Sequence, residues 1–219
     1  MKIRMGDATT RFSQDLDVAR QQDSEMFVAE LMESLRTGWN GFTGTLIAKA
    51  GPKPKGIPAE YIMEPFRVKM SYRGSDWTSV LLEVGHDELG DTLDLELRMA
   101  PEIIDLFRQV GLPAPSPVAV LASKHQIAQK LHAASVDGSE RAHDLVDLQL
   151  LEAHDFLDLK EIKETCERLF RFRNAHAWPP TIVESEGWDA LYQGSAEGLP
   201  VLPNVADAVI WVNDLVAAY

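Results

Sequence analysis

Apolar and polar residues follow two different spacings along this chain, and each spacing predicts a different element. Residues 23–38 repeat apolar side chains every three or four positions and end at a glycine, which predicts an amphipathic helix. Residues 61–72 instead end in a run of alternating apolar and polar side chains, which predicts a β-strand. Shorter strand-like runs occupy residues 9–19, 41–50 and 77–84. The N-terminal half is therefore expected to mix α and β structure.

The C-terminal half is dominated by helical spacing. Its predicted helices cover residues 101–110, 123–134, 140–153, 159–172 and 205–218. Residues 118–121 form a brief apolar run, and three prolines between Pro113 and Pro117 predict a stiff linker just before it. We therefore expect an α+β protein, with a mixed sheet and helices in residues 1–112 and a mainly helical part in residues 117–219.

Composition narrows the function classes. The chain has 219 residues and a formal net charge of −13, which argues against a general nucleic-acid coat protein but permits an enzyme that binds nucleic acid locally. Its one cysteine, Cys166, cannot form an internal disulfide, which indicates a reducing compartment. The polar start and the lack of an apolar run of about 20 residues predict no secretion signal and no membrane span. A cytoplasmic protein is expected.

Asp15 and Asp17 are the first candidates for chemistry. On a strand, alternate side chains share a face, so both carboxylates project together while Leu16 points the other way. Two adjacent carboxylates repel each other unless a cation lies between them. Hard oxygen ligands of this kind suit Mg²⁺, which combines a few carboxylates with substrate phosphates.

A third acid can come from either of two places. Glu83 lies within an apolar run at residues 80–84, where an acid is unexpected without a role or a partner. Glu96 has the same pattern within residues 93–97. That second run also fits a strand with leucines inward and solvated acids outward.

A second group of charged residues lies on two predicted helices. Lys130 borders an apolar helix face, as a lysine at the rim of a core does, but it could also bind phosphate. Asp144 and Asp147 are three residues apart and share a helix face, with Arg141 one turn earlier. They form either an exposed ladder of ion pairs or carboxylates tied to Lys130 or Arg141.

Other chemistry has weaker support. None of the six histidines has the spacing of a zinc site, and the sequence has no phosphate-binding glycine motif. Two basic stretches are either solvated faces or RNA contacts. One comprises Lys53, Lys55, Arg67, Lys69 and Arg73, and the other comprises Arg168, Phe170, Arg171, Phe172 and Arg173.

These motifs together resemble those of the AbiEii-type nucleotidyltransferase toxins, bacterial proteins with the DNA polymerase β-like nucleotidyltransferase fold. The resemblance rests on residues 10–17 (TRFSQDLD), the lysine motif at 127–133, the Arg-x-x-Asp-x-x-Asp motif from Arg141 to Asp147, and Leu82 to Gly85 as the strand with the further acid. It spans roughly residues 5 to 175. It implies a nucleotidyltransferase-like sheet followed by a mainly helical part.

The resemblance also implies roles for particular residues. Asp15 and Asp17, with Glu83 as the further acid, would hold Mg²⁺ on a nucleoside triphosphate (NTP), and Ser13 would help to seat the phosphates. Lys130 would contact the nucleotide phosphates, and Asp144 would orient that lysine or deprotonate the attacking hydroxyl. The acceptor implied is RNA, with tRNA ends a leading case, or protein, and a cognate antitoxin is the implied partner.

One departure from the family pattern concerns the start of the chain. The family normally has a helix and a Gly-Gly or Gly-Ser turn before the Asp-x-Asp strand, whereas Met1 lies only 14 residues before Asp15. We therefore expect a chain truncated at its N-terminus, with an incomplete triphosphate pocket. The alternatives to an active transferase are an inactive relative that acts as a binding protein, and an unrelated hydrolase with a metal on Asp15 and Asp17.

Overall fold

The chain divides into two compact units in the computed structural model. The structure describes residues 1–6, 10–11, 15–21, 23–51 and 62–219. One unit, here the sheet unit, spans Ser13–Leu93, and the other, the helical unit, combines Met1–Phe12 with Asp94–Tyr219. The sequence predicted a sheet part at residues 1–112 and a helical part at 117–219, whereas the structure groups both Met1–Phe12 and residues 94–112 with the helical unit.

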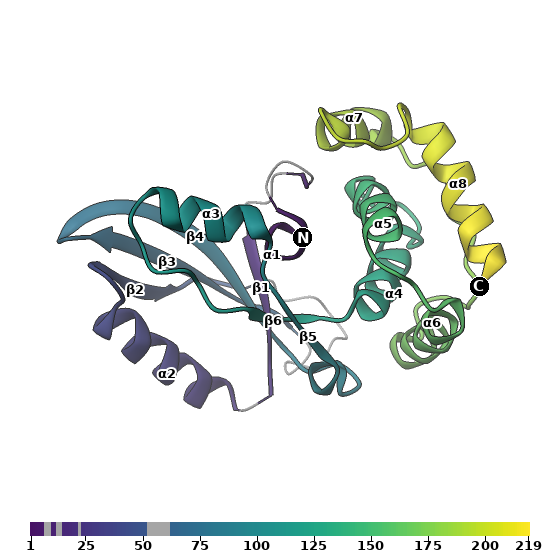
Figure 1. Cartoon of the computed structure of the whole chain (residues 1–219). Coiled ribbons are helices and arrows are strands. Elements are labelled where there is room, and N and C mark those ends of the chain that lie inside the picture. Colours follow the sequence, from purple (N-terminus) through teal and green to yellow (C-terminus); the bar gives the residue numbers. More distant parts are fainter. Residues whose placement is uncertain (7–9, 12–14, 22, 52–61) are drawn as a thin grey trace. The chain divides into compact units, whose positions relative to one another are not determined.

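The sheet unit is built on four strands in the spatial order β1-β4-β3-β2 (Figure 1). Its strands are β1 (Asp15–Arg20), β2 (Phe42–Ala48), β3 (Glu64–Tyr72) and β4 (Ser75–His86). β1 runs parallel to β4, while β3 pairs antiparallel with both β4 and β2. This mixed sheet confirms the expected fold class, and a short 3-10 turn (Asp91–Leu93) ends the unit.

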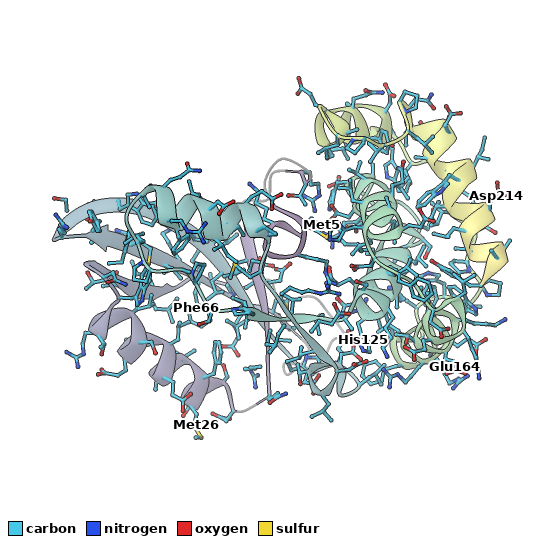
Figure 2. All side chains as sticks on the ribbon, in the orientation of Figure 1. Met5, Met26, Phe66, His125, Glu164 and Asp214 are labelled. Carbon is cyan, nitrogen blue, oxygen red and sulfur yellow. The ribbon has the colours of Figure 1, made fainter. Side chains whose placement is uncertain are left out.

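One helix, α2 (Ser24–Thr37), covers one face of this sheet (Figure 1). Its limits follow from the sequence: the Asp23 carboxylate accepts hydrogen bonds from the first backbone N–H groups, and Gly38 ends the helix at a φ of 71°. Phe66, labelled in Figure 2, packs with Leu82 and Val84 in the core beneath α2. Among the described residues of this unit, no α-helix covers the opposite face.

The helical unit contains most of the remaining elements. Its elements are α1 (Lys2–Met5), β5 (Leu95–Arg98), α3 (Pro101–Gln109), β6 (Val118–Leu121), α4 (Ser123–Ala134), α5 (His143–His154), α6 (Leu159–Arg173), α7 (Trp188–Ala196) and α8 (Val205–Ala218). α5 is its central helix, because it packs against α4, α7 and α8 and because eight consecutive residues, 144–151, are buried. In the part of the chain that the structure describes, no helix is both long and apolar enough to cross a membrane.

The pairing of β5 with β6 explains why residues 94–112 belong to the helical unit. The two strands are antiparallel, with Leu95 opposite Leu121 and Arg98 opposite Val118. The alternative of leucines inward and acids outward along this run is wrong, because Leu97 is 72% exposed while Glu96 is half-buried. The ladder therefore ties the segment before α3 to the strand that leads into α4.

A buried histidine on α4 predicts a pH-dependent stability. Burial, assisted by the nearby Arg173 and His176, lowers the pKa of His132 to about 4. An unfolded histidine titrates near 6.5. Between these two pH values His132 is protonated in the unfolded chain but neutral in the folded one. The free energy of unfolding therefore decreases as pH falls from about 6.5 toward 4, by up to about 2–3 kcal/mol.

We expect His132→Asn to remove this part of the pH dependence. Urea denaturation at pH 7 and pH 4.5 measures it as the difference in unfolding free energy between the two conditions. His154→Asn, at the exposed end of α5, is the matched control. An undiminished difference in His132→Asn would show that other groups cause the acid sensitivity.

Candidate functional site

The sheet unit brings three carboxylates together on its two adjacent parallel strands. Asp15 and Asp17 lie two residues apart on β1, and Glu83 on β4 lies directly opposite Asp17 in the strand register. One carboxylate oxygen from each residue lies within 4.8 Å of the other two. Both aspartates are exposed and Glu83 is half-buried. We call Asp15, Asp17 and Glu83 the acidic triad.

The geometry and chemistry of the acidic triad fit a divalent cation. Mg²⁺ binds oxygen ligands at about 2.1 Å, so ligands on opposite sides of the ion are about 4.2 Å apart. Small side-chain rotations would bring oxygens within 4.8 Å of one another to such a geometry. A cation between them would also offset the repulsion of three neighbouring negative charges.

The competing acid, Glu96, lies in different surroundings. Its carboxylate accepts hydrogen bonds from Arg4 Nη1 at 2.6 Å and from Arg98 Nε at 2.8 Å. Arg4 is itself buried and also donates to Asp155 at 2.9 Å. Glu96 therefore belongs to an ion-pair network that fastens α1 to β5 and to the end of α5. Glu83 is the acid that the structure groups with Asp15 and Asp17.

The helical unit contains a second charged cluster, formed where α4 faces α5. Lys130 Nζ donates hydrogen bonds to Asp144 Oδ1 at 2.9 Å and to Asp147 Oδ2 at 2.6 Å. Both aspartate side chains are only 1–2% exposed, so they are not an exposed ladder. Since a lysine has three N–H donors, one remains beyond these two bonds.

Arg11 completes this cluster. Its Nε and Nη2 atoms each donate to one oxygen of Asp147 at 2.9 Å, a two-pronged arrangement typical of strong arginine–carboxylate pairs. Arg11 had no predicted role, and Asp147 was not among the predicted catalytic residues. For Arg11 the only sequence signal was its place in the family motif, whereas Asp147 was already expected to share a helix face with Asp144. We call Arg11, Lys130, Asp144 and Asp147 the lysine cluster.

The charges of the lysine cluster stabilise one another. Burial acts to lower the pKa of Lys130, but the charges of Asp144 and Asp147 outweigh it and raise the pKa above its ordinary value. Burial acts to raise the pKa of Asp147, and Lys130 and Arg11 outweigh it, so this pKa is lowered. Lys130 therefore stays a cation and Asp147 an anion throughout the neutral pH range.

Asp144 has one buried oxygen that is not fully satisfied. Among the described residues, its Oδ2 atom accepts no hydrogen bond, although Arg141 Nε lies 3.1 Å away as an ion-pair partner. A buried carboxylate oxygen in this state is ready to accept a hydrogen bond from a hydroxyl group. Oδ2 of Asp144 is therefore the carboxylate oxygen of the cluster that remains open among the described residues.

The sequence candidates are thus distributed between the two units. Asp15, Asp17 and Glu83 come together in the sheet unit, and Lys130 and Asp144 come together in the helical unit. Ser13 lies outside the described residues. The roles assigned to all of these residues remain predictions.

Comparison with known proteins identifies the class of protein. The sequence model of the family described as "Nucleotidyl transferase AbiEii toxin, Type IV TA system" matches residues 1–210, so the chain belongs to this family of nucleotidyltransferase toxins. Among solved structures, its fold is similar to that of MenT4, a nucleotidyltransferase toxin from Mycobacterium tuberculosis. The TM-score is 0.52 at 18% identity, over 95% of this chain and 78% of that one. No curated protein matches the sequence.

Proposed function

We propose that this chain transfers a nucleoside monophosphate from an NTP to a hydroxyl group of an acceptor, in a Mg²⁺-dependent reaction centred on the acidic triad. The observation that carries the proposal is the convergence of Asp15, Asp17 and Glu83 from two strands. The membership of the chain in a nucleotidyltransferase family supports the same reaction class.

The reaction requires charge stabilisation at the α-phosphate. The acceptor oxygen attacks the α-phosphorus, the bond to the β-phosphate breaks, and pyrophosphate leaves with its charge. When bound, Mg²⁺ supplies neutralisation of the developing negative charge. Asp15 and Asp17 would hold the cation from one strand and Glu83 from the next, so the sheet would fix these three ligands relative to one another. The exposure of both aspartates leaves room for substrate oxygens.

The lysine cluster has two proposed tasks in this reaction. Lys130 remains a cation and has an N–H group beyond its two hydrogen bonds, so it can bind a phosphate oxygen of the nucleotide. Asp144 either orients Lys130 or accepts the proton of the attacking hydroxyl through its unsatisfied oxygen. Arg11 and Asp147 position Lys130 and hold it in place.

The acceptor and the partner are the finer parts of the proposal. We propose RNA, with tRNA ends as the leading case, and a protein hydroxyl as the second possibility. A cognate antitoxin fits the family's description as part of a toxin–antitoxin system. A cytoplasmic location remains a prediction.

Label transfer tests the proposed function. The protein is incubated with Mg²⁺, total RNA and each of the four NTPs labelled at the α-phosphate. We expect label in RNA with at least one NTP and none after Mg²⁺ is removed by EDTA. Label in a protein band instead would identify a protein acceptor. Folded protein that labels neither acceptor with any NTP would contradict the proposal and favour the inactive binding protein.

A further inference from the structure

The face of the sheet that carries the acidic triad also carries two cations. In paired strands, residues directly opposite each other point to the same face. Arg67 on β3 lies opposite Leu81, and Leu81 lies opposite Asp15 on β1. Lys69 follows two positions later on β3 and therefore shares that face. This is the face opposite α2, because the alternate residues Phe66 and Val68 pack beneath that helix.

The distances suit neighbouring groups of one extended ligand. Arg67 is two strands away from Asp15, which places their backbones about 10 Å apart. Lys69 lies about 7 Å further along β3, close to the separation of neighbouring phosphates in an extended nucleic-acid strand. Thr45 and Ser79 flank Lys69 in the register, so hydroxyl groups accompany the second cation.

Both cations are available to a ligand. Arg67 and Lys69 are exposed, as are Thr45 and Ser79 beside them. Among the described residues, no carboxylate lies at ion-pair distance from either cation, whereas Arg20 and Arg36 of the same unit both pair with glutamates. A pair of exposed cations without carboxylate partners on one face is suited to binding successive anionic groups.

The surrounding sequence is basic within an acidic protein. Residues 39–74 contain six lysine and arginine residues against two glutamates, while the whole chain has a net charge of −13. An overall negative charge repels polyanions, so a polyanion is expected to bind where the positive charges gather. The acidic triad lies on the same face, and the reaction proposed there needs an acceptor hydroxyl. The expected polyanion is therefore one that ends in a hydroxyl group.

We propose that this open face binds the acceptor as single-stranded nucleic acid, with consecutive phosphates on Arg67 and Lys69 and the terminal hydroxyl at the acidic triad. The inference rests on the proposed function. The Thr45 and Ser79 hydroxyls assist by donating to phosphate or sugar oxygens, as is common in backbone recognition. Because these contacts read the backbone, they bind RNA with little sequence preference.

The test is RNA binding in the absence of NTP, measured by the fluorescence anisotropy of a short labelled single-stranded RNA over a series of salt concentrations. We expect Arg67→Gln/Lys69→Gln to weaken binding about tenfold and to lower the salt slope by about 1.4, since each single-strand phosphate contact contributes about 0.7. Arg36→Gln, which removes an exposed cation of α2 on the opposite side of the sheet, should leave both quantities unchanged.

The kinetics of transfer separate this inference from the proposed function. If Arg67→Gln/Lys69→Gln raises the KM for RNA above that of the wild type and leaves the KM for NTP unchanged, the inference is supported. If the double variant raises only the KM for NTP, the inference is overturned, because the cations then bind the nucleotide. Unchanged RNA affinity in the double variant overturns it even when the wild type transfers nucleotides. A wild type that labels only protein and does not bind RNA also overturns it. A wild type that binds RNA but transfers nothing, together with weakened RNA binding in the double variant, supports the surface and contradicts the proposed function.

Discussion

The Asp15→Asn/Asp17→Asn variant is expected to lose nucleotidyl transfer by about a thousandfold or more while staying folded. A metal ion contributes several kcal/mol of charge stabilisation to phosphoryl-transfer transition states, and each 1.36 kcal/mol corresponds to a factor of ten in rate. Both aspartates are exposed, and their replacement removes repulsion within the acidic triad. Because both positions are exposed, the variant should still show a cooperative thermal unfolding transition. Single-turnover label transfer and thermal unfolding measure the two effects.

The matched control for this variant is Asp76→Asn, an exposed acid near the turn between β3 and β4. It removes one negative charge from the same unit without touching the acidic triad, so transfer should continue at the wild-type rate. Glu83→Gln should fall between the control and the double variant, because the two aspartates still offer ligands. A double variant with near-normal transfer would remove the acidic triad from the mechanism.

The second large effect concerns stability. Asp147→Asn is expected to destabilise the folded protein by about 3–5 kcal/mol, the usual cost of leaving buried charges without their partner. Asp147 is 1% exposed and binds both Lys130 and Arg11, so the amide removes the buried negative charge that these two cations share. Chemical denaturation followed by circular dichroism measures the change, and Asp137→Asn in an exposed turn is the control.

A double-mutant cycle distinguishes a coupled cluster from independent residues. Lys130→Met removes one of the two cations that bind Asp147, so the two changes together should cost less than the sum of the single changes. We expect a coupling energy of about 1–3 kcal/mol in the free energy of unfolding. Strict additivity would show that Lys130 and Asp147 stabilise the protein independently, in conflict with their 2.6 Å hydrogen bond.

Much of the fold could be read from local patterns. Two helix predictions, residues 123–134 and 205–218, coincide with α4 and α8. The side chain of Asn204 caps α8, whereas Ala122 at the N-cap of α4 makes no side-chain hydrogen bond, so regular apolar spacing is the signal that the two helices share. The N-cap at Asp23 and the glycine at 38 likewise gave α2 within one residue at each end. In these segments the local signal and the tertiary structure agree.

The domain boundary could not be read in the same way. The prolines between Pro113 and Pro117 are a strong local signal, but the contacts that decide the division are distant in sequence. β5 pairs with β6 across the whole of α3, and Arg4 reaches Glu96 and Asp155 from the other end of the unit. No spacing rule predicts such pairings.

In the candidate site, too, features set by neighbouring residues could be predicted, whereas contacts between residues far apart in the sequence could not. Alternation along β1 predicted that Asp15 and Asp17 share a face, and the structure groups them with Glu83 as expected. The partnership of Arg11 with Asp147 spans 136 positions and was missed. Local pattern did not distinguish Glu83 from Glu96, because both lie in apolar runs. The family resemblance favoured Glu83, and the partners of the two acids separate them in the structure.

The most direct measurement of the central claim is a Mn²⁺ titration followed by electron paramagnetic resonance, with a non-hydrolysable NTP analogue present. The signal of free Mn²⁺ disappears on binding, so the titration counts protein-bound ions without requiring turnover. We expect a bound ion in the wild type beyond what the nucleotide alone holds, and we expect its loss in an Asp15→Asn/Asp17→Asn/Glu83→Gln variant that still unfolds cooperatively. Equal Mn²⁺ binding by the two proteins would contradict the claim that the acidic triad holds the catalytic metal.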